Sequence, residues 1–170
     1  SAVATRAADA FYRAFLLPPQ ALTVYVNCIN AGSNALSGSA SRRLFQIGTN
    51  SGAAPTELTA YWNGTRYALL HWNGVDNVEA NNTIVAPSNM ARVEYRAILN
   101  ADGSVQAGQA FNGGAETVGT ASAALALSTT WVLSSIYIGG SNTADIQTQN
   151  NFLQLKVAAG VFTMAQMRTL

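Results

Sequence analysis

The groups that could act as acids or bases are few, with eight Asp and Glu residues and one histidine in 170 residues. Glycoside hydrolysis needs two carboxylates that face one sugar, roughly 5–9 Å apart. The closest acidic pair, Asp76 and Glu79, has an odd spacing and lies in a segment that resembles a turn. Glu94 stands between Arg92 and Arg96 on one strand face, which predicts a solvated ladder of charges. We therefore expect no catalytic pair of acids and no catalytic residue.

A catalytic triad combines a nucleophile, a histidine that acts as the base, and an acid, and His71 is the one histidine in the sequence. A single imidazole cannot build a metal site from two or three histidines. If Asn63-Gly64 forms a two-residue turn, counting outward places Thr56 opposite His71. In that register His71 shares an apolar strand face with Leu58 and Ala60, so we interpret it as a packed core residue.

The opposite face of the same strands carries side chains that suit sugar recognition. With Trp62 paired with Thr65, Tyr61 lies opposite Arg66, and Trp72 points the same way. Aromatic faces stack on the C–H faces of sugar rings, and arginine donates hydrogen bonds to hydroxyls or carboxylates. Tyr61, Arg66 and Trp72 are therefore our candidate ligand-binding residues, with packing of Trp72 in the core as the alternative.

Charge and composition argue against several other partners. Nine Lys and Arg against eight Asp and Glu leave a net charge of +1, with one Lys and eight Arg scattered along the chain. This distribution provides no basic stripe for a row of phosphates. No apolar run approaches the ~18 residues of a membrane span. Cys28 cannot form an internal disulfide, and its alternation with Val24 and Val26 predicts a small buried residue. We expect no nucleic acid, no membrane insertion and no cofactor.

Short strands between turns are the elements that must position these residues. Asn-Gly or Asp-Gly pairs at 63–64, 73–74, 102–103 and 112–113 suit tight turns, since these residue types tolerate positive φ. Between them, apolar and polar residues alternate with period two, which predicts β-strands. The expected strands are Leu22–Cys28, Arg43–Gly48, Thr56–Trp62, Thr65–Trp72, Val93–Leu99, Ser104–Phe111, Glu116–Thr120, Leu133–Gly139 and Leu153–Ala158. This pattern predicts an all-β antiparallel β-sandwich.

The two ends of the chain follow different patterns. Thr163 followed three residues later by Gln166 is the pattern of a capping box, which predicts one short C-terminal helix. Residues 1–17 fit a helix or a strand equally well. Enrichment in Gly, Ser and Asn predicts surface loops at residues 30–41, 48–54 and 141–151. The length fits one domain, residues 1–170, and the initial Ser leaves open whether it was excised from a longer chain.

The order of these elements resembles the laminin-G-like branch of the concanavalin A-like jelly roll. The matching pieces are Leu22–Cys28, Arg43–Gly48, Val93–Leu99 with the hairpin at 100–105, Phe111–Gly114 and Ile136–Gly140. The last strand, Leu153–Ala158, leads into Phe162–Met167, which matches the short helix that follows the last strand in that family. The likeness covers residues from about 20 to 170. A composition rich in Ala, Asn, Ser and Thr, with one Lys, also looks like structural proteins of tailed bacteriophages.

Departures from the family pattern limit what this resemblance implies. The Glu-x-Asp-x-x-Glu strand of the family's glucanases does not occur in the sequence, so hydrolytic activity is not carried over. Laminin-G modules often hold calcium with loop carboxylates and carbonyls. The corresponding loop here offers Asp145 among Asn142, Thr143 and Gln147. Calcium is a hard dication that needs several carboxylate or carbonyl oxygens, and one carboxylate supplies too few of them, so we expect no metal.

Three functional hypotheses follow from the residues and the resemblance. The first is a noncatalytic module of a phage virion that recognises a host-surface carbohydrate on a tail fibre or tail tip. The alternative is a structural role, in which the sandwich decorates or cements a capsid or tail and binds only other virion proteins. The third is an enzyme of the same superfamily that uses a tyrosine or His71. A phage setting implies a homo-oligomer, trimeric at a fibre tip, on the tail or capsid surface.

Overall fold

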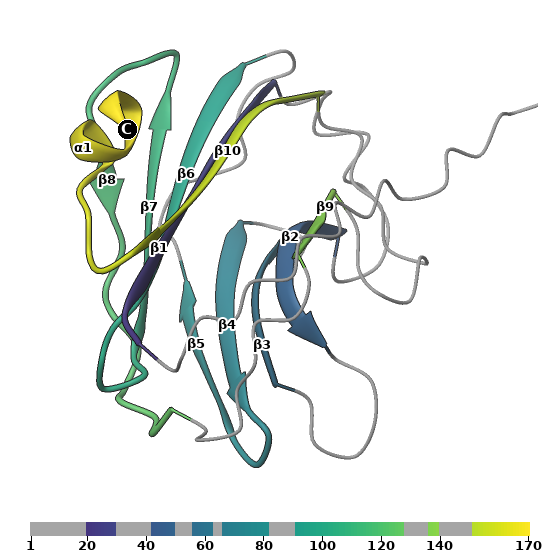
Figure 1. Cartoon of the computed structure of the whole chain (residues 1–170). Helices are drawn as coiled ribbons and strands as arrows, with labels where there is room; N and C mark the ends of the chain where they lie inside the picture. The colour runs from purple at the N-terminus through teal and green to yellow at the C-terminus, as the bar shows by residue number, and fades with distance from the viewer. Residues whose placement is uncertain are drawn as a thin grey trace, which may run out of the picture.

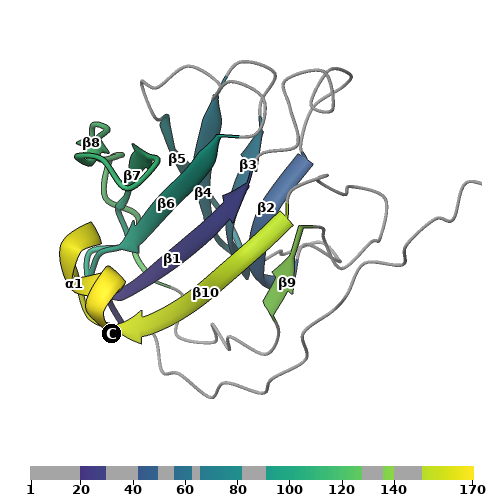
Figure 2. The ribbon, with the colours of Figure 1, turned by 90° about the horizontal axis from the view of Figure 1, so that it is seen from above.

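Two antiparallel β-sheets lie face to face and form a sandwich in the computed structural model (Figures 1 and 2). The structure describes residues 20–29, 42–49, 56–62, 66–81, 91–127, 136–139 and 151–170. The first sheet has the order β10-β1-β6-β7-β8, and the second has the order β5-β4-β3-β2-β9. The first sheet comprises β1 (Leu22–Ile29), β6 (Arg92–Leu99), β7 (Val105–Phe111), β8 (Thr117–Val118) and β10 (Asn151–Ala159). The second comprises β2 (Arg42–Thr49), β3 (Thr56–Trp62), β4 (Tyr67–Asn73), β5 (Asn77–Asn81) and β9 (Ile136–Ile138).

The predicted all-β antiparallel sandwich is confirmed, and every predicted strand overlaps an observed one. The turn expected around Asp76 and Glu79 is wrong, because Asn77–Asn81 is strand β5 and pairs with β4. The turn lies just before it, where the Asn73 side-chain oxygen accepts the Val75 and Asp76 N–H groups, both at 2.9 Å. The predicted loop at 30–41 and residues 1–17 lie outside the described residues, as do 50–54 and 141–150 of the other two loops.

Alternation along the strands places apolar side chains between the sheets, where they form the core. Cys28 is 1% exposed, as its alternation predicts, and burial raises the pKa of its thiol to about 12. Tyr67 of β4 and Tyr95 of β6 meet edge to face, with ring centroids 5.9 Å apart. The core is therefore shared by both sheets. Its buried members include Leu22, Val24, Val26, Phe45, Ile47, Leu58, Ala60, Leu69, Val93, Ala97, Leu99 and Val105.

The pairing of β3 with β4 differs from the expected register by two residues. Leu58, rather than Thr56, lies opposite His71. The connection runs from residue 63 to residue 66 instead of being a two-residue turn. A slip of two residues keeps every side chain on its predicted face, because side chains alternate with period two. His71 is accordingly buried on the core side at 0% exposed, as expected.

The C-terminal helix α1 (Met164–Thr169) begins with the predicted capping box. The Gln166 side-chain oxygen accepts the Thr163 N–H at 2.8 Å, and the Thr163 hydroxyl accepts the Gln166 N–H at 3.2 Å. Met164 and Met167 of the helix are buried with Tyr25. Figure 1 shows α1 on the side of the first sheet that faces away from the second sheet. The helix thus closes part of the outer face of the first sheet.

Candidate functional site

The outer face of the second sheet, turned away from the core, combines polar and aromatic side chains in neighbouring strands. The register of β2 to β5 determines which residues share this face. We call this set the polar face. Its members are Arg43, Gln46, Glu57, Thr59, Tyr61, Leu70, Trp72, Asn77 and Glu79.

The middle of the polar face is a buried network around Arg43. The Arg43 guanidinium donates to the Glu57 carboxylate at 3.1 Å and to the Gln46 side-chain oxygen at 2.5 Å. The Arg43 side chain is 10% exposed and that of Glu57 is 3% exposed. Burial raises the pKa of Glu57, and the charge and hydrogen bond of Arg43 offset this only in part. The network holds these side chains in one arrangement and commits the guanidinium to protein partners.

Two aromatic side chains stand partly exposed around this network. The Tyr61 hydroxyl donates a hydrogen bond to the exposed Glu79 carboxylate on β5. Burial and this contact raise the pKa of Tyr61. Trp72 lies opposite Glu57, and its indole Nε1 has no hydrogen-bond partner among the described residues. Tyr61 and Trp72 are separated by four residues along the strands, or about 13 Å, a span wider than one sugar ring.

The structure brings two of the three candidate ligand-binding residues onto one face. Tyr61 and Trp72 both point outward from the second sheet, as predicted. The predicted pairing of Tyr61 with Arg66 is wrong, since Ala68 lies opposite Tyr61. Arg66 precedes β4 and is partly exposed beside the polar face. The error has the same cause as that at His71, namely a connection longer than the two residues assumed.

Sequence reasoning missed the remaining polar members of this face. Glu57 and Tyr61 are four residues apart on a correctly predicted strand, so alternation alone puts them on one face. The position of Glu79 on this face was not predicted, because the sequence of its segment predicts a turn rather than a strand. Arg43 was hidden because β2 is irregular between Arg43 and Phe45, where the alternation breaks.

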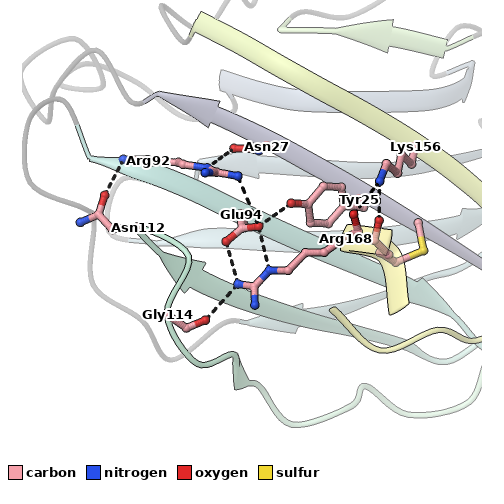
Figure 3. Close-up of polar contacts among 9 residues, drawn as sticks. Tyr25, Asn27, Arg92, Glu94, Asn112, Gly114, Lys156 and Arg168 are labelled. Carbon is pink, nitrogen blue, oxygen red and sulfur yellow. Dashed lines mark hydrogen bonds and ion pairs between the residues drawn. The ribbon is translucent and has the colours of Figure 1, made fainter. Parts of the chain in front are cut away.

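The outer face of the first sheet holds a second polar cluster, centred on Glu94 (Figure 3). Arg168 of α1 donates to both Glu94 carboxylate oxygens, at 2.9 and 2.7 Å. The Tyr25 hydroxyl donates to the same carboxylate at 2.5 Å, and Arg92 lies 3.9 Å from it. The predicted solvated ladder is therefore wrong at Glu94, which is 1% exposed. The same ladder is wrong at Arg96, which is buried and donates to Glu116 at 2.5 Å.

The Glu94 cluster anchors the helix. Burial raises the pKa of Glu94, but hydrogen bonds from Arg168 and Tyr25 outweigh it and hold the pKa below its ordinary value. Burial and Glu94 together raise the pKa of Tyr25 to about 12. Lys156 adds two bonds to helix carbonyls, at 2.7 Å to Met167 and 3.2 Å to Arg168. Tyr25 and Glu94 are each 1% exposed and fully engaged, so a substrate cannot reach them in this arrangement.

Metal ligation and imidazole chemistry find little support in the described part of the chain. Its residues contain no group of three His, Cys, Asp or Glu side chains that could hold a metal ion. Asp145 and its neighbours, in the loop that corresponds to the calcium-binding loop of laminin-G modules, lie outside the described residues. His71 Nδ1–H donates to the Gly103 carbonyl at 2.7 Å, and burial lowers the pKa of its imidazole. No helix within the described ranges has the length and apolar character to cross a membrane.

The two sheets and the closing helix define a jelly roll of the laminin G type. Similar folds occur in the LG1-3 region of the laminin α2 chain, with a TM-score of 0.66 and 9% identity over 89% of this chain. Domains LG4-5 of the mouse laminin α1 chain match with a TM-score of 0.58 and 12% identity over 87% of this chain. This chain spans 30% and 40% of those two structures.

A bacterial module matches over almost its full length. The CBM40 of the Ruminococcus gnavus IT-sialidase, solved bound to α2,3 sialyllactose, has a TM-score of 0.63 and 9% identity. The match covers 98% of this chain and 94% of that module. No family model matches the sequence, and no curated protein sequence matches it significantly. The likeness is therefore one of fold, and it confirms the expected laminin-G-like jelly roll.

Proposed function

We propose that this chain is a noncatalytic carbohydrate-binding module whose polar face holds a glycan. One observation carries the proposal: Tyr61 and Trp72 are partly exposed on the same outer sheet face, around a buried polar network. The equivalent face of the first sheet is occupied in part by α1 and its Glu94 anchor. The partly exposed aromatic side chains are thus on the second sheet, where they flank fully buried members of the polar face such as Gln46 and Thr59.

The chemistry of the polar face matches the needs of a sugar ligand. Aromatic rings supply flat apolar surfaces for the C–H faces of sugars, and fixed polar groups orient the hydroxyls. The spacing of Tyr61 and Trp72 suits an oligosaccharide better than a single sugar. The CBM40 module with the same fold binds sialyllactose in its structure, which supports a carbohydrate as ligand class.

The direct test uses Tyr61→Ala and Trp72→Ala, with Val118→Ala on the other sheet as a control. Val118 is an exposed apolar residue remote from the polar face. On a glycan microarray and in calorimetry, the two aromatic variants should lose binding while the control keeps it. Thermal melting should change little in all three. Unchanged binding in both aromatic variants, or no glycan bound by the folded wild type, would refute the proposal.

We further propose that the module serves in a phage virion, on a tail fibre or tail tip that recognises a host-surface glycan. The support is compositional, with many Ala, Asn, Ser and Thr residues and one Lys. In that setting the chain would form a homo-oligomer, trimeric at a fibre tip. Light scattering of the purified protein gives its oligomeric state. Antibodies to the chain should label phage tails in electron micrographs, and absence of label from virions would refute this placement.

A structural role in the virion is the second candidate, and the exposed edge of the first sheet favours it. Leu153 on edge strand β10 is 55% exposed, and Val161 and Leu170 beyond it are also exposed. Apolar groups on a sheet edge suit packing against other proteins. Under this hypothesis the domain would bind capsids or tails in pull-down experiments and ignore every glycan. Glycan binding that depends on Tyr61 would exclude a purely structural role.

A further inference from the structure

We infer that the polar face selects neutral glycans, and that Glu79 is the residue that disfavours sugars carrying a carboxylate. This inference rests on the proposed function and specifies the ligand class of the same site. It separates this chain from the CBM40 structure, whose ligand, sialyllactose, is acidic.

The hydrogen bond between Tyr61 and Glu79 determines what the exposed rim of the face can offer. The Tyr61 hydroxyl donates its proton to a Glu79 carboxylate oxygen. The phenolic oxygen and the remaining carboxylate lone pairs can then only accept hydrogen bonds. Sugar hydroxyls can donate to such acceptors, and a charged acceptor makes those bonds stronger. An ionised sugar carboxylate has no proton to donate, so it gains nothing at this position.

The arginine of the polar face offers no compensating partner for a carboxylate. The Arg43 guanidinium already donates to Glu57 and Gln46, and its side chain is 10% exposed. Pairing Arg43 with a sugar carboxylate would require the side chains around it to move and a second anion to be buried beside Glu57.

The exposed charges along β5 add to the same preference. Glu79 is exposed, and so is Asp76 in the turn that leads into β5. Arg43 lies opposite Tyr61 in the pairing of β2 with β3, but its side chain is 10% exposed, and Arg66 is partly exposed in the connection before β4. A sugar carboxylate held about 6 Å from Glu79 in a watery setting would lose roughly threefold in affinity. Salt would weaken this effect, because charges at the surface are screened.

The experiment compares neutral glycans with their acidic counterparts on wild type and Glu79→Gln. A glycan microarray with matched neutral, sialylated and uronate-bearing forms identifies the best pair, and calorimetry then measures both affinities at low and high salt. Asp102→Asn is the matched control, because it also removes one exposed negative charge but lies on the β6–β7 hairpin. Wild type should prefer the neutral form by at least about threefold. Glu79→Gln should narrow that ratio by about threefold at low salt and less at high salt, and the control should not.

The outcomes separate this inference from the function on which it rests. Equal or tighter binding of the acidic glycan by wild type would overturn the selectivity. If Arg66→Gln then lost this binding of the acidic glycan, Arg66 would be the residue that pairs with the sugar carboxylate. An unchanged ratio in Glu79→Gln would overturn the role of Glu79. Binding to no glycan at all would refute the proposed function itself.

Discussion

Removal of Arg168 should destabilise the protein more than neutralisation of its partner Glu94. Arg168 donates two charged hydrogen bonds to Glu94, whose side chain is 1% exposed, whereas the Arg168 side chain is 32% exposed. Arg168→Ala therefore leaves a buried carboxylate with the Tyr25 hydroxyl and the more distant Arg92. Discounted for the partial exposure of Arg168, the expected loss is about 2–3 kcal/mol.

Glu94→Gln should lower the free energy of unfolding by less than Arg168→Ala does, by about 1 kcal/mol. The glutamine oxygen can still accept the Tyr25 hydroxyl, and Arg168 can turn toward water. In a domain of this size, about 2–3 kcal/mol lowers the melting temperature by roughly 5–10 °C. The double variant should be close to Glu94→Gln alone, because no buried charge is left without its partner.

The same pair gives the stability a defined pH dependence. The pKa of Glu94 in the folded protein lies below its ordinary value of 4.5. A carboxylate of this kind stabilises the fold above its unfolded pKa, and that contribution is lost as the pH falls from about 4.5 toward the folded value. Glu94→Gln should remove this acid-sensitive part of the unfolding free energy.

Urea denaturation followed by tryptophan fluorescence at pH 7 and at pH 3.5 measures these differences. At pH 7 the free energy of unfolding should be lowest for Arg168→Ala, higher for Glu94→Gln and highest for wild type. The gap between wild type and Glu94→Gln should shrink at the lower pH. An inverted order, or a gap that does not depend on pH, would refute the assignment of Glu94 as the charged anchor of α1.

Three further predictions concern the turns, the histidine and the helix cap. Gly103→Ala should lower the melting temperature several-fold more than Gly113→Ala, although both glycines have positive φ. A Cβ at Gly103 would lie 1.5 Å from the Leu125 carbonyl oxygen, whereas a Cβ at Gly113 would have no atom within 4 Å. Equal losses in the two variants would contradict this packing. His71 should stay neutral as the pH falls below its ordinary pKa of 6.5, so its imidazole NMR signals should not titrate at that value. Thr163→Ala should cost about 1 kcal/mol by loss of the capping box, and a neutral effect would argue against the cap.

Local patterns in the sequence determined most of the fold. Alternation along Leu22–Cys28 and Val93–Leu99 correctly predicted two strands and the apolar faces that line the core, because a side chain's face depends only on whether its position is odd or even. The opposite faces of both strands are buried as well, which alternation did not predict. The Asn112-Gly113 turn also follows from local chemistry, with φ of 52° and 77° at its two central residues. The capping box depends on two residues three apart, so it too is readable from sequence.

Strand register and the membership of the polar face were decided by tertiary structure. The Asn63-Gly64 pair signals a turn but does not determine its length. The predicted register of β3 with β4 is therefore wrong by two residues, while the predicted faces of Tyr61 and Trp72 are correct. Strand β5 has few strand-forming residues, and its pairing with β4 outweighs that weak local preference.

The burial of charge was also beyond local reasoning. Glu94 and Arg168 are 74 residues apart in sequence, and an acid between two arginines on a strand looks solvated until a helix from the chain's end covers it. Likewise, Gly103 and Gly113 follow the same turn signal, and only the packing of Leu125 against one of them makes a difference. Local sequence determines the conformation and facing of each segment, but the contacts made at a distance determine which charges are buried and which groups are left to bind a ligand.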